Sequence, residues 1–407
     1  MECQVSGTDS APPPRQEKGP ALGDQAPVAP SSPRLSMVAA HDPDSAVLVR
    51  RLLEAAIQLL PKARVAGGFA FTLSGTRAPD GGWQLHPLGI STRYGAIAAL
   101  GLLQLAERDQ RAILAGEVGL DLVGHLAKRL DDETDPGDVA LLCWAAAEAG
   151  HSELPHALQR LAALDQGHEP VDVVAAAWIV TALVAARSHA DVERHLAAAR
   201  DRLLAARDAV YPHVIGVTSG YRSHVACFAD QIYPVQALSR LHRSADDPRA
   251  LAAADTVAAM ICQAQGPAGQ WWWHYDSRTG GVVERYPVYS VHQHAMGPMA
   301  LLDLADAGGQ VYLEAICRGL RWLAGPAETS EALVLDEPPV AWRKVARSDP
   351  RKLVRGLRAA ATRMRPGTRL PLLDRMFPPG AIDHECRPYE LGWLLLAWLT
   401  SPGDCHG

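Results

Sequence analysis

The sequence predicts an all-α protein in which six helical hairpins close into a ring, an (α/α)6 toroid. Three observations support this fold class. Six segments are too apolar to be surface helices, more amphipathic segments lie between them, and no later region resembles a set of alternating strands. A helix that is apolar on nearly all sides must be buried on nearly all sides, so the six segments form an inner layer.

The six apolar segments share one design, a polar or turn-forming opening followed by an apolar run. They begin at Ser91, Gly137, Val171, Ala229, Tyr289 and Arg387. Amphipathic segments that begin at Ser45, Asp191 and Pro248 suit an outer layer, with one face on the core and one in water. Because outer and inner helices alternate six times, we expect one domain despite the length of 407 residues.

The predicted domain covers residues 44–401, between two unstructured ends. Residues 1–43 contain eight of the 30 prolines and almost no periodic apolar pattern, which predicts a disordered Pro-rich tail. Residues 402–407 are expected to form a flexible C-terminus. The last inner segment is preceded by an insertion, residues 327–386. Within it, residues 343–369 carry ten Lys or Arg and one acid. Such a run is usually a solvated helix face, and contact with an anionic polymer is the alternative.

Composition restricts the partners and the location. The formal net charge of −6 gives no general argument for binding nucleic acid or anionic membranes. The seven cysteines are dispersed, without a C-x-x-C pair, as expected for reduced structural thiols. The N-terminus has no apolar run typical of a signal peptide, and no apolar stretch is long enough to span a bilayer. We therefore expect a cytoplasmic protein.

The fold predicts where a site lies. Inner helices of a toroid run parallel, so their N-terminal ends, with unpaired N–H groups and partial positive charge, open on one side. Those ends favour carboxylates and hydroxyl-rich ligands. The candidates at the six openings are Arg93, Tyr94, Asp230, His292, Gln293, His294, Tyr389 and Glu390. Asp138 and Asp172 also lie there, and helix capping is the favoured role for both.

An aromatic stretch, Gln270–His294, leads into the fifth inner helix and should lie across the mouth of the pocket. Pyranose rings stack on aromatic faces while their hydroxyls bond to charged side chains, so this composition suits a saccharide. Three consecutive tryptophans cannot all point the same way, so at least one is structural. Together with a polar cluster that opens the fourth inner helix, the predicted saccharide-binding residues are Tyr221, Arg222, His224, Trp271, Trp272, Trp273, His274, Tyr275, Arg285 and Tyr289.

Acid–base chemistry has several candidates. Paired carboxylates can protonate a glycosidic oxygen and activate water. A Tyr or His beside a neutralising Arg can instead abstract a proton next to a uronate, as lyases and epimerases require. The candidates for these roles are Asp230, Asp276, Glu284, His292, His294, Tyr389 and Glu390. We expect five of them, namely His292, His294, Asp276, Glu284 and Tyr389, to line one cavity. No metal or cofactor is expected.

Two short motifs are weaker than they look. The aspartate-rich run Asp131–Asp135 matches a pattern that binds Mg-diphosphate, but Pro and Gly follow at once, which favours a turn. The terminal Cys405–Gly407 resembles a zinc element of helical cyclases, but it lies at the chain end and lacks a partner motif.

The alternation of helices over residues 45–400 resembles the six-hairpin glycosidase-like toroids, which include hydrolases, lyases and sugar epimerases. The segments QWWWHYD, VYSVHQHAMGPMAL and DHECRPYELGWLL are also similar to those of uncharacterised bacterial proteins associated with exopolysaccharide biosynthesis. These resemblances imply a carbohydrate-active protein that acts on a bacterial glycan or glycan precursor. They imply no particular reaction.

Two other functions stay open. Terpenoid cyclase and prenyltransferase toroids share a repeat of Gln, a spacer and Gly-x-Trp, which Gln265–Trp271 matches and Gly81–Trp83 matches in part. Their D-x-D-D acid and zinc set are absent from this sequence. The third possibility is a non-catalytic glycan-binding or assembly protein of a polysaccharide pathway. The sequence leaves the oligomeric state undetermined.

Overall fold

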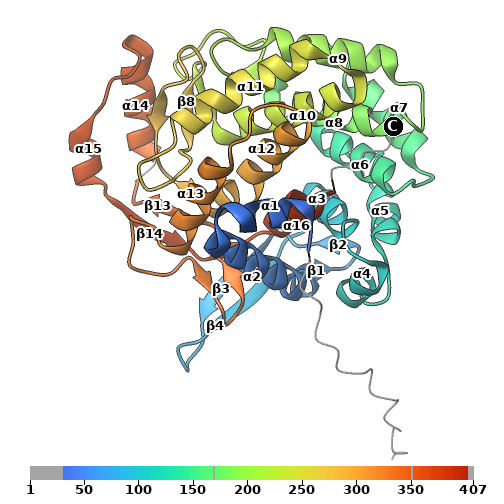
Figure 1. Ribbon diagram of the computed structural model, residues 1–407, viewed down its shortest axis with the longest axis horizontal. Coiled ribbons are helices and arrows are strands. Elements are labelled where there is room, and N and C mark those ends of the chain that lie inside the picture. The colour runs from blue at the N-terminus through green and yellow to red at the C-terminus, as the bar shows by residue number, and fades with distance from the viewer. Residues whose placement is uncertain (1–30, 168–169, 350–351, 402–407) are drawn as a thin grey trace, which may run out of the picture.

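The computed structural model describes residues 31–167, 170–349 and 352–401, and these form an (α/α)6 toroid (Figure 1). Within them the inner layer consists of α3 (Thr92–Leu102), α6 (Pro136–Glu148), α8 (Val173–Ala186), α10 (Phe228–Ala245), α12 (Gly297–Asp306) and α16 (Pro388–Leu399). Each inner helix contacts the next, and α16 packs against α3, which closes the ring. The six predicted inner segments are therefore confirmed.

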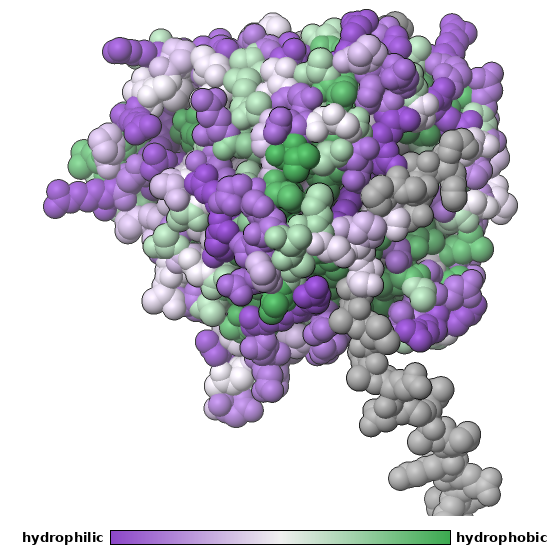
Figure 2. Space-filling view, viewed as in Figure 1, coloured by the Kyte–Doolittle hydropathy of each residue, from purple (hydrophilic) through white to green (hydrophobic). Residues whose placement is uncertain are grey.

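The outer layer alternates with the inner one along the chain. It consists of α2 (Pro43–Leu59), α5 (Gly119–Ala127), α7 (Leu154–Leu164), α9 (Glu193–Ala205), α11 (Pro248–Gln263) and α13 (Leu313–Ala324), with the short α4 (Glu107–Ile113) before α5. The surface in Figure 2 mixes hydrophilic and hydrophobic residues, as expected where each outer helix turns one face to water. No described helix is long and apolar enough to cross a membrane.

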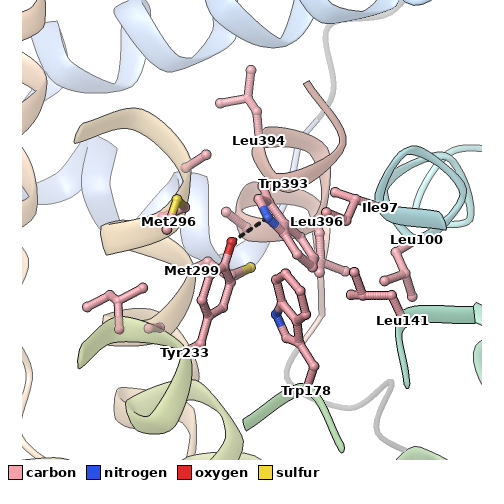
Figure 3. Close-up of a cluster of buried hydrophobic side chains, with 14 of the residues drawn as sticks. Ile97, Leu100, Leu141, Trp178, Tyr233, Met296, Met299, Trp393, Leu394 and Leu396 are labelled. Atoms are coloured by element: carbon pink, nitrogen blue, oxygen red, sulfur yellow. Dashed lines mark hydrogen bonds between the residues drawn. The ribbon is translucent and has the colours of Figure 1, made fainter. Parts of the chain in front are cut away.

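Side chains from all six inner helices fill the centre of the ring (Figure 3). Trp393 of α16 donates a hydrogen bond of 2.8 Å to the hydroxyl of Tyr233 on α10. Trp178 of α8 packs edge-on against the same tyrosine at 5.0 Å between ring centroids. Ile97, Leu141 and Met299 complete the cluster from other helices. The centre is therefore a packed core and not a channel.

Two glycines let α3 and α16 approach closely. A Cβ atom on Gly101 would lie 2.4 Å from the carbonyl oxygen of Gly392, and one on Gly392 would lie 2.4 Å from that of Ile97. Neither position therefore has room for a side chain. The Gln265–Trp271 segment is also structural, because Gln265 donates to the carbonyls of Gly269 and Ala315, both at 2.8 Å.

Helix α1 (Pro33–His41) corrects the predicted tail, which was expected to be disordered up to residue 43. Leu35 and Val38 are buried, and the buried Arg34 forms ion pairs with Asp303 and Asp306 at the end of α12. The helix has only nine residues and docks partly through these ion pairs, so sequence periodicity does not show it. The rest of the predicted tail, residues 1–30, and the predicted C-terminal segment 402–407 lie outside the described residues.

Short strands at the entrances to inner helices were not predicted. They are β1 (Arg64–Val65), β2 (Gly68–Phe69), β3 (Thr72–Arg77), β4 (Trp83–Leu88), β5 (Val171–Asp172), β6 (Val214–Ile215), β7 (Val225–Cys227), β8 (His274–Asp276), β9 (Val282–Glu284) and β10 (Val288–Tyr289). With 2–6 residues each, most are too short to show a period of two. The sheets gather at the end of the ring where the inner helices begin.

The insertion before α16 folds onto this same end. It contains β11 (Val334–Leu335), β12 (Val340–Ala341), β13 (Lys344–Arg347), α14 (Leu353–Met364), α15 (Pro371–Met376), β14 (Pro379–Asp383) and β15 (Glu385–Cys386). Strand β13 pairs with β10 and β14, and β15 pairs with β3, which is followed by the projecting strand β4 (Figure 1). The insertion thus joins the first and fifth inner-helix entrances.

The basic run in the insertion is only in part the solvated helix face that was favoured, since Arg363 and Arg365 are exposed. Arg347 and Arg358 are buried and share the carboxylates of Glu284 and Asp374. These charges hold the insertion against β9, so much of the positive charge is used within the protein.

Candidate functional site

Aromatic rings from α3 and α16 form one wall at the N-terminal ends of the inner helices. The rings of Tyr94 and Tyr389 lie 4.7 Å apart, and Phe71 stacks on Tyr94 at 5.2 Å. Arg387 donates to the hydroxyl of Tyr94 at 3.0 Å and lies over the ring of Phe71. The wall therefore carries flat faces and a cation side by side.

The entrance to the fifth inner helix forms a second aromatic wall. Here η2 (His292–Met296), a π-helical turn, precedes α12. Tyr289 lies 5.0 Å from His292 and 6.2 Å from Trp273, measured between ring centroids. Arg343 lies over the ring of Tyr289, and Arg355 lies 4.1 Å from the centre of the Trp273 ring. The insertion thus brings cations to both aromatic faces.

Two adjoining cavities open beside the second wall. One, of about 460 Å³, is lined by Tyr221, Arg222, Trp273, His274, Lys352, Arg355 and Gly356. The other, of about 300 Å³, shares Tyr221 and Arg222 and is also lined by His213. Burial and the charges of Arg222 and Arg355 lower the pKa of His274 well below its usual value, so this ring is neutral. The excess of arginine favours an anionic ligand.

A histidine held by a buried carboxylate lies at the entrance to α10. His213 Nδ1 lies 3.1 Å from an oxygen of Asp230, which also accepts the backbone N–H of Cys227 at 2.6 Å. The Asp230 carboxylate is buried, whereas the His213 side chain is 57 % exposed. The hydrogen bond that the Asp230 carboxylate accepts from the ring raises the pKa of His213. This pair can hold a proton and release it to a bound molecule.

A second titratable pair lies at the entrance to α6. Arg93 forms ion pairs with Asp138 and Asp135 and lies over the ring of Trp178. Burial raises the pKa of Asp138 to about 6 although Arg93 opposes this shift. The favoured capping role of Asp138 is wrong, because Asp135 caps the helix through the N–H groups of Gly137 and Asp138. Asp172 is the N-cap residue of α8, as Asp135 is of α6, but its side chain makes no capping hydrogen bond.

Glu390 and His294, which follow the aromatic residues of the two walls in sequence, are buried. Burial raises the pKa of Glu390 to about 8, with Arg343 and Arg387 opposing, and lowers that of His294 to about 3. Both side chains are therefore neutral at pH 7. They line a cavity of about 10 Å³, which has room for about one water molecule.

Asp276 and Glu284 face the insertion instead of the aromatic walls. Asp276 is held by Arg278 at 2.7 Å, and Glu284 is 1 % exposed between Arg347 and Arg358. The expectation that both line one cavity with His292, His294 and Tyr389 is therefore wrong. The charge of Glu284 is neutralised by arginines distant in sequence, and that of Asp276 by Arg278 in the following turn.

Several predicted binding residues belong to the core or to another cavity. Trp271, Trp272, Tyr275 and Gln293 are buried, and Trp271 stacks on Phe228. Arg285 lies over the ring of Trp272. His224 lines a separate cavity beside α9 and α14. Of the three consecutive tryptophans, Trp273 alone lines one of the described cavities beside the aromatic walls.

Other site residues were missed by sequence reasoning. They are Phe71, His213, Arg343, Arg355 and Arg387. The charge of the insertion was a signal for Arg343 and Arg355, but not for where they dock. His213 lies in a loop without any pattern. Among the residues described, no three His, Cys, Asp or Glu side chains are grouped as metal ligands.

The fold and this entrance define an (α/α)6 toroid with an open end rich in aromatic residues and arginine. No protein-family model and no curated protein matches the chain. Solved structures share its fold at low sequence identity. An unsaturated glucuronyl hydrolase specific for heparin has 15 % identity and a TM-score of 0.53, over 86 % of this chain and 95 % of that one.

Two further solved structures agree. The unsaturated glucuronyl hydrolase of Bacillus sp. GL1 has 14 % identity and a TM-score of 0.53, over 86 % of this chain and 94 % of that one. The enzyme of Streptococcus agalactiae has 11 % identity and a TM-score of 0.52, over 86 % and 90 %. At such identities the likeness establishes the toroid alone.

Proposed function

We propose that this protein is a carbohydrate-active enzyme that acts on an anionic saccharide at the N-terminal ends of the inner helices. The observation that carries the proposal is the pairing of aromatic rings with arginines at the entrance to the fifth inner helix. Tyr289 lies beneath Arg343, and Trp273 lies beneath Arg355. Half-buried aromatic rings suit the C–H face of a pyranose, and arginine suits a carboxylate or sulfate.

The solved structures of the same fold support this class of substrate. They are named as unsaturated glucuronyl hydrolases, and one is described in complex with dGlcA-GalNAc6S. A glucuronyl group carries a carboxylate, which fits the excess of arginine at this entrance. A saccharide containing a uronic acid is therefore the substrate to test first, with hydrolysis as the first reaction and lyase or epimerase chemistry as alternatives.

His213 and Asp138 are the acid–base groups that we propose for the reaction. His213 is exposed, and Asp230 orients its ring and stabilises its protonated form. Asp138 has a pKa of about 6, suited to proton transfer near neutral pH. In a hydrolysis one such group donates a proton to the glycosidic oxygen while the other activates water.

A non-catalytic glycan-binding protein is the second candidate, and one observation favours it. All four carboxylates predicted as acids or bases are buried, namely Asp230, Asp276, Glu284 and Glu390. The terpenoid alternative loses support, because Trp393 and its neighbours fill the centre of the ring. A role in exopolysaccharide biosynthesis and a cytoplasmic location stay predictions from the sequence.

The test compares binding with turnover. Purified protein is screened by thermal shift against uronate-containing oligosaccharides, neutral oligosaccharides and prenyl diphosphates, and by release of reducing sugar from the oligosaccharides. We expect a uronate saccharide to raise the melting temperature and to be cleaved. His213→Ala should lower turnover about 100-fold or more, the typical contribution of a general acid or base.

The matched control is His156→Ala. His156 is also an exposed histidine with carboxylate partners, Asp131 and Glu153, but it lies on the outer helix α7. It should leave turnover unchanged. Binding without turnover of any substrate would support the glycan-binding candidate, and a response to prenyl diphosphates alone would contradict both.

A further inference from the structure

A third cavity lies beside the proposed site and shares with it the loop of residues 212–224. It has a volume of about 760 Å³ and is formed by the end of α9, the loop of residues 212–224, the turn after β8 and the end of α14. Val214, Val217 and Ser223 line both this cavity and the 300 Å³ cavity that contains His213. This loop thus lines both the cavity of about 760 Å³ and the cavity of about 300 Å³.

The cavity has two chemically different sides. Pro212, Val214, Ile215 and Val217 form an apolar side. Ser223, His224, Ser277, Arg278 and Arg363 form a polar side, and Arg202 and Asp208 also line the cavity. A sugar ring has a C–H face and a rim of hydroxyls, so this division of apolar and polar surface suits another pyranose unit.

His224 lines this cavity and has one buried ring nitrogen without a partner in the described part of the chain. Its side chain is buried, and Nε2 lies 3.0 Å from the hydroxyl of Thr362. Its Nδ1 atom has no hydrogen-bond partner among the described residues. Burial lowers the pKa of His224, so the ring is neutral and can exchange hydrogen bonds with a hydroxyl.

Of the three arginines that line this cavity, one has no carboxylate partner among the described residues. Arg202 is paired with Asp165, and Arg278 with Asp276. Arg363 is exposed and donates to the hydroxyl of Ser223 at 2.9 Å, and no carboxylate of the described residues lies within ion-pair distance of it. The carboxylate of Asp208 opposes an anion on the α9 side, so the α14 side is the favoured position for one.

We propose that the saccharide bound at the aromatic walls continues past Tyr221 and the loop of residues 212–224 into this cavity. The protein then recognises an anionic oligosaccharide of several units instead of a monosaccharide or disaccharide. This inference rests on the proposed function and specifies the size of its substrate. Tyr221 and Arg222 line both cavities at the aromatic end, which provides continuity between the two sites.

The test uses a ladder of oligogalacturonates and heparin-derived oligosaccharides, from two to six units, in isothermal titration calorimetry at about 0.15 M salt. We expect affinity to rise at least about tenfold from dimer to hexamer. Arg363→Ala should remove about tenfold of hexamer affinity, the size of one hydrogen bond to a charged group, and leave dimer affinity unchanged.

Arg365→Ala is the matched control, since Arg365 is an exposed arginine two residues away that lines none of these cavities. It removes the same charge and should leave both affinities unchanged. Affinity that is independent of length, or an equal effect of the two substitutions, would overturn the extended site alone. Absence of binding by every probe would contradict the proposed function and the extended site together.

Discussion

Two buried carboxyl groups show how hydrogen bonds decide charge at the scale of single residues. Asp303 and Glu390 are both about 1 % exposed. Asp303 accepts hydrogen bonds from Arg34 and Arg240, which hold its pKa well below the usual range. Glu390 has Arg343 and Arg387 nearby, but both bond to Glu385, so burial raises the pKa of Glu390 to about 8.

The raised pKa of Glu390 predicts a dependence of stability on pH. The folded protein holds a proton on Glu390 up to about pH 8, whereas the unfolded chain releases it near pH 4.5. Stability from this group is therefore present at low pH and is lost as pH rises between these values. We compare the free energy of unfolding of Glu390→Gln with that of the wild type. The difference in favour of the variant should be larger at pH 8.5 than at pH 5 by about 2 kcal/mol or more.

Melting temperatures of both proteins across this range provide the measurement. Glu153→Gln is the control, because Glu153 is half-exposed on the outer layer. Parallel curves for the wild type and Glu390→Gln would show that the Glu390 carboxyl is ionised in the folded protein.

At the scale of helices and strands, the inner helices were predictable because their apolar runs are continuous. The run VVAAAWIVTALVAA of α8 is buried over nearly its whole length, as its composition requires. The strands were not predictable, because β13 and β15 pair with β10 and β3, far away in sequence. Such short strands depend on partners that only the folded ring brings together.

A glycine in the contact between α3 and α16 and a glycine in open space should respond differently to the same substitution. Gly392→Ala should lower the free energy of unfolding by about 2 kcal/mol, because its Cβ would overlap the carbonyl of Ile97. Gly356→Ala, in α14, should be neutral or stabilise by up to about 1 kcal/mol, because a Cβ there meets nothing within 4 Å.

Urea denaturation of the two variants is the measurement, and each serves as the control for the other. Equal stabilities would mean that α3 and α16 can separate without cost, contrary to their packing in the ring.

At the scale of the whole molecule, the two ends of the ring differ. The end where inner helices begin carries the strands, the insertion and the proposed site. The opposite end is covered by α1, whose Arg34 also donates to the carbonyl of Ala397 at the end of α16. A cation is well placed there, because C-terminal helix ends carry partial negative charge.

This arrangement predicts that Arg34 stabilises the closed ring. Arg34→Ala leaves the buried Asp303 with fewer partners and should cost about 3 kcal/mol in the free energy of unfolding. Arg321→Ala is the matched control, because Arg321 also contacts two carboxylates, Asp42 and Glu314, but is half-exposed. Its cost should stay below about 1 kcal/mol. A similar loss of stability in both variants would argue against a special role for α1.

The sequence by itself determined the ring, because the apolar runs and their alternation with amphipathic helices are local properties of the chain. It also indicated the end of the ring where polar and aromatic residues gather, and with it Tyr94, Trp273, Tyr289 and Tyr389. Helix direction relates Tyr94 and Tyr389, which lie in the first turns of α3 and α16, and Tyr289, which lies just before η2. Trp273 was indicated by the aromatic stretch that leads into the fifth inner helix.

Only the tertiary structure decided which charged groups are available there. Asp276 and Glu284 look like catalytic carboxylates in the sequence, but arginines that are distant or hidden in a turn neutralise them. His213 has no sequence pattern, yet the fold brings it to Asp230. The charge and accessibility of a titratable side chain depend on its neighbours in space, and those neighbours come from parts of the chain that local patterns do not connect.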